Sequence, residues 1–375
     1  IRYEFYGRQI YKAIDTEKWS YVGQLKNKQP VNGRITFKEN PQKLIQFSGK
    51  IKTLVDYNVI GTGEMIQESA DFFKIISQGT IVNSLLQGEE CRRMRSDIPE
   101  YVEVGTFQKG LLQGKGLVQS KDEIYEGNFE MGVRHGAGIV KMLQTKTTIH
   151  VQFENGELIQ KTELYCEQTN ERWIRQSGNE KQGYVGIKTI KNQVSEGNFD
   201  NQLQFHGTIK TTTDQGYFIE EFQHGRKIKI IEMNMKDLCI ENLSGNEIAG
   251  YSGNKITQSY SYQGELNQKL EEHGHGVKTL KNEKLIGSFK NGLMHGIIRR
   301  EQNEDYMVEQ YEDDKLVRWI SGKQGEVSWI INSGDETGYI GVKKWQDCTY
   351  EGQLSNSGQI HGYGIKTLSN NTVIK

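Results

Sequence analysis

Histidine is the side chain in this sequence best suited to chemistry, because it can bind metals and exchange protons near neutral pH. Five of the eight histidines stand directly before a glycine at the same position of a recurring pattern: His135, His206, His273, His295 and His361. They are far apart in the chain, whereas a metal site needs several ligands that converge in space. His273 and His275 share a strand face, but no third ligand accompanies them. We therefore assign these histidines to turns that they stabilise, and we predict no metal site.

Two glycine-rich stretches, Gly61-Thr62-Gly63 and Gly183-Tyr184-Val185-Gly186, could be taken for phosphate-binding loops. Such a loop needs a strand before it and a helix after it, so that backbone amides converge on the phosphate. Neither stretch precedes an amphipathic helix pattern, and the lysine-serine pair of a Walker loop is missing. No serine-hydrolase elbow, zinc-protease motif or kinase catalytic loop is present either. We expect a chain that is not an enzyme, with no catalytic residue and no cofactor.

Composition excludes several other classes of protein. The chain has 375 residues, with 47 basic and 48 acidic side chains, so it lacks the positive charge that nucleic-acid binding requires. No apolar stretch is long enough for a membrane-spanning helix. The 18 tyrosines and 13 phenylalanines argue against disorder. The four cysteines are scattered, without zinc-type spacing, which indicates a reducing compartment.

A repeat positions all of these residues. Its clearest copy runs from Tyr125-Glu126-Gly127 to His135-Gly136-Ala137-Gly138, and similar copies occupy residues 262–276, 286–296 and 350–364. The glycine of the Tyr-x-Gly triplet marks a position that we call the slot, which recurs about every 22 residues. Glycine fills the slot at Gly105, Gly127, Gly197, Gly264, Gly287 and Gly352. Other residues fill it at Val151, Arg175, Glu220, Glu241, Glu309 and Ile331.

The spacing within one repeat predicts a β-hairpin. Tyr125, Gly127 and Phe129 alternate with polar residues, which is typical of a half-buried antiparallel strand. Gly132 and the His135-Gly136 pair supply the backbone freedom for chain reversal, and a second alternating strand follows. A glycine between two aromatics lets a ring from a neighbouring hairpin lie over bare backbone. An isolated hairpin is marginal in water, so stability must come from contacts between successive repeats.

We therefore assign a structural role to the aromatic and glycine positions of the repeat. These positions are Tyr125, Gly127, Phe129, Gly136, Gly138, Gly197, Phe199, Tyr262, Gly264, Gly274, Gly276, Gly287, Phe289, Gly296, Tyr350, Gly352, Gly362 and Gly364. Trp173, Trp319, Trp329 and Trp345 lie in the divergent repeats, as core fillers or as anchors for a partner. The basic cluster Arg92, Arg93 and Arg95 is either an exposed loop or a contact for anionic lipid or acidic protein.

The copies at 125–138, 262–276, 285–296 and 350–364 resemble the MORN repeat. The resemblance implies an all-β fold, an elongated, twisted single-layer antiparallel sheet of consecutive β-hairpins with a groove. Residues 1–102 would form divergent N-terminal hairpins, with a loop or insertion near 85–102. Residues 103–375 would form an array of about 12 hairpins that continues beyond 375. Several slots depart from the glycine of the family, so those hairpins are expected to pack differently.

The resemblance also implies a function. MORN arrays act mainly as scaffolds, so we expect a non-catalytic structural protein that mediates protein–protein contacts in a large cytoskeletal assembly. The preferred setting is the axoneme of a cilium, by analogy with radial spoke heads, with other subunits and MORN-type homo- or hetero-association as partners. A lipid-binding membrane-surface module is the first alternative, which the net charge of −1 disfavours. The regulatory MORN array of a larger enzyme is the second.

Overall fold

The computed structural model describes residues 2–6, 9–39, 43–335, 338–355 and 358–375. Every helix or strand within these residues is a β-strand. Correspondingly, the described part of the chain contains no helix with the length and hydropathy needed to cross a bilayer. The chain divides into two compact units, one comprising Ile1–Lys191 and Phe199–Leu203, the other Asn192–Asn198 and Gln204–Lys375.

Among the described residues, the first unit contains seventeen strands. They are β1 (Arg2–Tyr6), β2 (Gln9–Asp15), β3 (Trp19–Lys26), β4 (Gln29–Phe37), β5 (Leu44–Val55), β6 (Asn58–Glu68), β7 (Lys74–Val82), β8 (Leu85–Leu86), β9 (Gly88–Arg95), β10 (Val102–Gln108), β11 (Leu111–Gln119), β12 (Glu123–Glu130), β13 (Val133–Met142), β14 (Thr147–Glu154), β15 (Glu157–Cys166), β16 (Glu171–Asn179) and β17 (Gly183–Ile190).

The strand β18 (Gln193–Phe199) lies at the boundary, and the second unit continues with the remaining strands. They are β19 (Phe205–Thr213), β20 (Gly216–Gln223), β21 (Arg226–Met235), β22 (Leu238–Asn246), β23 (Gly250–Thr257), β24 (Tyr260–Leu266), β25 (Glu272–Leu280), β26 (Lys284–Lys290), β27 (Leu293–Gln302), β28 (Asp305–Glu312), β29 (Lys315–Gln324), β30 (Val327–Asp335), β31 (Gly338–Lys344), β32 (Cys348–Leu354), β33 (Ile360–Leu368) and β34 (Val373–Ile374).

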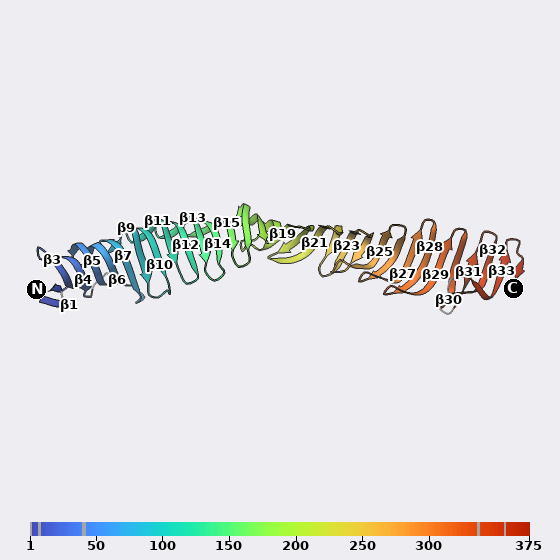
Figure 1. The fold of residues 1–375 in the computed structure, drawn as a ribbon, viewed down its shortest axis with the longest axis horizontal. Helices are drawn as coiled ribbons and strands as arrows, with labels where there is room; N and C mark the ends of the chain where they lie inside the picture. Colours follow the sequence, from blue (N-terminus) through green and yellow to red (C-terminus); the bar gives the residue numbers. More distant parts are fainter. Residues whose placement is uncertain (1, 7–8, 40–42, 336–337, 356–357) are drawn as a thin grey trace. The chain divides into compact units, whose positions relative to one another are not determined.

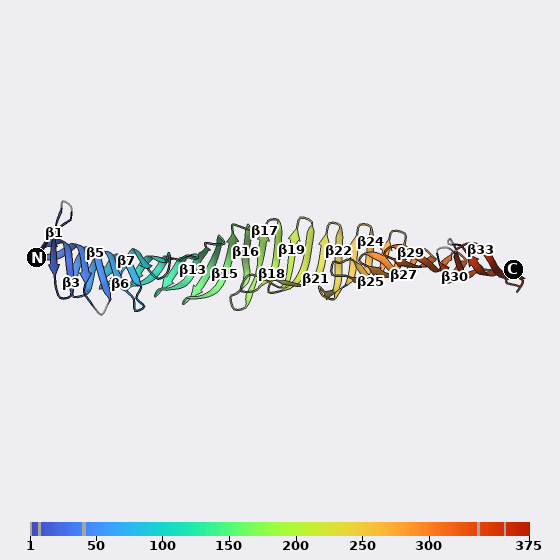
Figure 2. The same cartoon turned by 90° about the horizontal axis from the view of Figure 1, so that it is seen from below.

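Within each unit the strands pair in chain order, antiparallel, as Figures 1 and 2 show. In the first unit, for example, β12 pairs with β11 on one side and β13 on the other, so that Gly116, Gly127 and Gly138 lie side by side. In the second unit, β24 and β25 pair in the same manner through Gly264 and Gly276. The prediction of an all-β, open, single-layer antiparallel sheet of consecutive hairpins is confirmed.

Several hairpin turns of the regular repeats are tight two-residue turns with both residues in the left-handed region. Met131 and Gly132 have φ values of 49° and 83°, and Asn291 and Gly292 have 51° and 87°. Positive φ at both positions is typical of a type I′ turn, whose twist matches that of the flanking strands. Such a turn favours Asn-Gly, which is the pair found at 291–292.

The segment near 85–102 differs from the predicted loop or insertion. β8 and β9 both pair with β7, and β9 also pairs with β10, so residues 85–95 form the return of a hairpin. Cys91 is fully buried there, while the neighbouring Arg92 is exposed. Charged residues at both ends of the strand concealed its alternation. Arg93 lies in this strand, where it pairs with the buried Glu103 and stacks 5.2 Å from the ring of Phe107.

The two compact units divide near residues 191–204, whereas the predicted boundary at 102/103 separated divergent repeats from regular ones. That boundary describes how closely the repeats follow one pattern, and it stays a prediction. The core of each unit lies on one face of its sheet. Tyr21, Phe47, Tyr125 and Phe153 belong to the buried cluster of the first unit, and Tyr262 and Phe289 to a cluster of the second.

Candidate interaction surface

In the regular repeats, the tyrosine ring covers the glycines of its own hairpin. A Cβ atom added to Gly127 would lie 2.4 Å from Oη of Tyr125, and one added to Gly138 would lie 2.5 Å from Cε2 of the same ring. Gly127 lies two residues after Tyr125 on β12, and Gly138 faces Gly127 from β13. The ring therefore comes from the same hairpin, and the expectation of a ring from a neighbouring hairpin is wrong.

The same arrangement recurs along the chain. The ring of Tyr262 occupies the Cβ space of Gly276, with Oη at 2.2 Å, and the ring of Tyr350 does so at Gly364, with Cζ and Oη at 2.3 Å. Gly264 and Gly352 complete the corresponding slots, with Oη of the same tyrosines at 2.8 and 2.7 Å. Because no side chain other than hydrogen fits beneath these rings, the glycine requirement has a steric cause.

The tyrosine hydroxyl has a role that phenylalanine could not fill. Oη of Tyr262 donates to the carbonyl oxygens of Glu265 (3.0 Å) and His273 (3.2 Å), and these are alternative acceptors for one proton. The strand register shifts at this point, between Gly264 and Leu266. A bulge leaves carbonyl groups without a strand partner, and burying them unpaired costs free energy. The hydroxyl supplies that partner, so the ring both covers the slot and satisfies the bulge.

Contacts between successive repeats run through the residue two places after the slot. The ring of Tyr125 meets Phe129 of its own strand at 5.2 Å and Phe153 of the next hairpin at 5.5 Å, both edge-on. Tyr262 meets Phe289 of the next hairpin at 5.4 Å in the same geometry. Such edge-to-face pairs add to the gain from burial. Each hairpin is thereby coupled to its neighbour through an aromatic contact.

Where no tyrosine stands two residues before the glycine of the slot, a side chain of the returning strand covers that glycine. A Cβ on Gly287 would lie 3.0 Å from Cδ1 of Ile298, and one on Gly197 would lie 3.0 Å from Cδ1 of Ile209. Phe199, two residues after Gly197, is buried and meets the ring of Trp173 at 6.0 Å. An aliphatic side chain from the partner strand thus replaces the ring.

The tryptophans of the divergent repeats fill the core. Trp173 is fully buried over Gly186, and Trp329 is 9% exposed over Gly322, so each ring covers a glycine on an adjacent strand. Arg175 and Ile331 occupy the slots two residues after these tryptophans. Trp319 and Trp345 are partly buried against the cluster of Tyr339, Tyr350 and Leu354.

The histidine-glycine pairs lie inside returning strands and not in turns. His135 and Gly136 belong to β13, and Gly136 has a φ of 70°. The other members, Gly274, Gly296 and Gly362, have φ values of 58°, 88° and 73° within β25, β27 and β33. This backbone bends the strand at the register shift, where glycine is favoured. The prediction that these pairs form the turns is wrong, because each turn ends before the returning strand that contains the pair.

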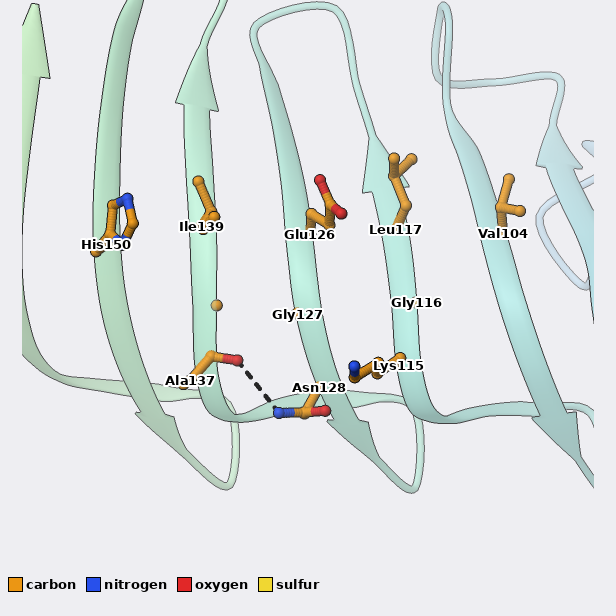
Figure 3. A pocket seen from close by; sticks show the side chains of 11 residues that line it. Val104, Lys115, Gly116, Leu117, Glu126, Gly127, Asn128, Ala137, Ile139 and His150 are labelled. Atoms are coloured by element: carbon orange, nitrogen blue, oxygen red, sulfur yellow. Dashed lines mark hydrogen bonds between the residues drawn. The ribbon is translucent and has the colours of Figure 1, made fainter.

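The opposite face of the sheet carries a groove of ≈ 550 Å³ across β10–β14. Figure 3 shows it from close by. Its lining residues are Val104, Leu117, Glu126, Ile139 and His150 on one side, and Lys115, Asn128 and Ala137 on the other, with Gly116, Gly127 and Gly138 between them. Because adjacent residues of a strand point to opposite faces, this surface is the one turned away from the Tyr125 ring.

The side chains that line the groove are partly apolar and partly polar. Glu126 pairs with Lys141 at 3.7 Å, and the amide of Asn128 donates to the carbonyl oxygen of Ala137 at 3.3 Å. The floor of the groove is strand backbone whose hydrogen bonds already go to the neighbouring strands. The second unit carries similar grooves, of ≈ 390 Å³ beside Gln263 and Val277 and of ≈ 740 Å³ beside Tyr363 and Ile365. Such open grooves are suited to contacts with a partner that extends along several strands, and they do not enclose a small molecule.

The described residues include no group of three or more His, Cys, Asp or Glu side chains that could hold a metal ion. All four cysteines are free thiols. Hydrogen bonds from Thr169 lower the pKa of the Cys166 thiol to about 7. This thiol belongs to no metal-binding group of side chains among the described residues. Lys255 forms an ion pair with the buried carboxylate of Glu272, at 3.3 Å.

The buried tyrosines predict a dependence of stability on alkaline pH. Burial raises the pKa of Tyr125, Tyr251 and Tyr262 above the usual value. A raised pKa in the folded state contributes stability that is fully present below the unfolded pKa of about 10 and is lost as pH rises further. We expect the urea midpoint of the full chain to fall above that pH, in step with tyrosinate absorbance. A midpoint that stays constant through tyrosine ionisation would contradict this expectation.

Four segments of the chain match the family model of the MORN repeat, at residues 104–122, 125–140, 286–297 and 350–373. They correspond to the hairpins β10–β11, β12–β13 and β26–β27 and to the strands β32–β34. No curated protein matches the chain. The predicted copy at 262–276 lies outside the matched segments, although Tyr262 covers Gly264 and Gly276 in the same geometry.

Proposed function

We propose that this chain, which contains four MORN repeats, is a non-catalytic structural scaffold that holds other proteins together in a large cytoskeletal assembly. MORN repeats are in general modules for interaction with proteins or membranes. The observation that carries the proposal is the groove of ≈ 550 Å³ across β10–β14, because its lining residues belong to five successive strands. A partner that lies along it would bury surface on several repeats at once, as stable protein contacts require.

The proposed setting is the axoneme of a cilium, with the chain in the cytoplasm and attached to the cytoskeleton. The preference over other assemblies rests on analogy between repeat arrays. Gentle affinity purification of the native protein, followed by mass spectrometry, tests the scaffold. We expect a stable set of co-purifying proteins that remains with axonemes after detergent extraction. A monomeric protein without partners would refute the scaffold.

Substitutions in the groove test whether the co-purifying proteins bind there. Leu117→Lys with Ile139→Lys places two charges on the groove wall, since both residues line it. We expect these changes to remove the co-purifying proteins while the far-ultraviolet circular dichroism stays that of a β-sheet. The matched control is Leu111→Lys with Val133→Lys, in the same two strands but beside the hairpin turns, where both residues are exposed. If both variants lose the co-purifying proteins equally, the groove is not their binding site.

A further inference from the structure

The second unit carries two rows of side chains with different chemistry on the face turned away from its core. One row has five aliphatic members, Ile286, Val308, Ile330, Val342 and Ile365, after which we call it the apolar row, and Arg299, Ser321 and Glu351 lie between them. The other runs through Lys284, Glu301, Tyr306, Lys323, Ser328 and Lys344, and we call it the basic row after its three lysines. The rows cross β26–β33 side by side, because their members are two residues apart on shared strands.

The strand register places both rows on one face. Lys323 of β29 faces Tyr306 on one side and Ser328 on the other, and Ser328 in turn faces Lys344. The residues between the rows point the opposite way: Trp329 is 9% exposed, and Tyr350 is 5% exposed. Alternation along the strands therefore leaves the rows outside the core.

The apolar row is accessible. Ile330 is 58% exposed and Ile365 is 44% exposed. They are flanked by Ile340, at 50%, and by Tyr363, at 91%. Isoleucines gathered on one sheet face, beside charged residues, are typical of an interaction site, whereas single exposed apolar residues are not.

The carboxylate of the basic row, Glu301, pairs with Arg299 and not with a lysine of the row. Lys284, Lys323 and Lys344 form no ion pair with any part of the chain that the structure describes. Arg299, which lies in the apolar row, does pair with Glu301 at 2.7 Å and stacks on the ring of Tyr306 at 4.0 Å.

The corresponding face of the first unit provides a contrast. There Lys141 pairs with Glu126 at 3.7 Å, and Arg172 pairs with Glu163 at 2.9 Å, so these two cations meet carboxylates of their own sheet. The basic row of the second unit would instead receive its carboxylates from outside the described chain.

We propose that β26–β33 bind an acidic amphipathic helix of a partner protein, with its apolar stripe on the apolar row and its carboxylates on the basic row. The inference rests on the scaffold function proposed above and names the chemistry of one partner. Neighbouring strands are about 4.8 Å apart, close to the 5.4 Å pitch of an α-helix, so a helix that crosses the strands meets roughly one strand per turn. An extended peptide repeats its side chains about every 6.7 Å on one face and would lose this match.

A protein partner is favoured over a lipid surface. Recognition of anionic lipid uses clusters of about 4–8 basic residues, at about 1 kcal/mol for each residue near the surface. The basic row offers three unpaired lysines, spread over β26, β29 and β31, and the exposed Glu351 lies on the same face. This pattern fits carboxylates held at defined places on a helix, and not the diffuse charge of a membrane.

The test uses the full chain and two synthetic helical peptides of about 20 residues, long enough to cross about six strands. Both carry the same apolar stripe, flanked by glutamates in one peptide and by lysines in the other. We expect the chain to bind the acidic peptide and not the basic one. The variant with Lys284→Glu, Lys323→Glu and Lys344→Glu should bind the acidic peptide about tenfold more weakly or worse, and should gain affinity for the basic peptide.

The matched control reverses three exposed lysines in turns, Lys121→Glu, Lys181→Glu and Lys281→Glu, which changes the net charge equally. We expect this control to bind the acidic peptide as the unmodified chain does. Equal binding of both peptides, or equal loss in the control, would overturn the inference. So would lysine-dependent flotation with phosphatidylserine vesicles in the absence of peptide binding. If partners still co-purify with the native protein in that case, the scaffold function stands and only this assignment fails.

Discussion

Replacing Gly138 with valine is expected to lower the free energy of unfolding by roughly 2–4 kcal/mol, through loss of the buried Tyr125 ring. A Cβ at this position would lie 2.5 Å from Cε2 and from Oη of that ring. Gly138 does not have a positive φ, so the cost comes from the ring and not from backbone strain. The ring must leave its site, and its edge-on contact with Phe153 is lost with it. Urea unfolding of the full chain measures the loss, and hydrogen exchange locates it to β12–β14.

Two further variants distinguish this explanation from a general intolerance of strands to substitution. Ala137→Val changes the adjacent residue, whose exposed side chain lies on the other face, and should alter stability by less than about 0.5 kcal/mol. With Tyr125→Leu already present, Gly138→Ala should cost less than it does beneath the tyrosine, since most of the clash is gone. An equal cost in both backgrounds would show that the ring does not determine the need for glycine.

Replacing Arg300 with methionine is expected to destabilise the second unit by about 3–5 kcal/mol, the range for removal of one partner from a buried ion pair. Nε of Arg300 lies 3.3 Å from Glu309, and Nη1 lies 2.6 Å from Glu283. Nη2 donates to Oη of Tyr311 at 3.0 Å, and that hydroxyl donates to Glu309 at 2.8 Å. The Glu309 side chain is 6% exposed, so it would stay buried without its cation.

The double variant Arg300→Met with Glu309→Leu provides the control. With the carboxylate removed as well, no buried charge lacks a partner, and most of the lost stability should return. Glu283 keeps access to water, since 27% of its side chain is exposed. Hydrogen exchange at β27–β28 measures both variants in the full chain. If the double variant is as unstable as the single one, burial of Glu309 is not the cause of the loss.

The repeat was visible in the sequence because glycine and tyrosine recur at one spacing. The alternation around Gly127 predicted the strand, and the divergent slots at Val151, Glu220 and Glu309 were located by spacing alone. In the structure these three residues lie next to register shifts, as Gly127 does. Spacing is preserved when the slot residue changes, because every repeat must supply strands of similar length to neighbours on both sides.

Other features could not be predicted from spacing. His135-Gly136 was expected to form a turn, but a glycine with positive φ serves a bulge as well as a turn, and the sequence does not distinguish them. Two signals could have corrected the assignment. The pair Asn291-Gly292 marks the turn directly. The choice of tyrosine over phenylalanine at Tyr125 and Tyr262 indicates a buried acceptor for the hydroxyl.

The sequence by itself determined the period, the strands and the need for glycine at the slots, since alternation and spacing are local properties of the chain. The tertiary structure alone decided which hairpin each ring covers, that Trp173 and Trp329 lie over glycines of adjacent strands, and that Lys323 and Lys344 share a row with Tyr306. These relations depend on register. A shift of one residue between paired strands would move every side chain to the other face, and only the packed sheet selects among the registers.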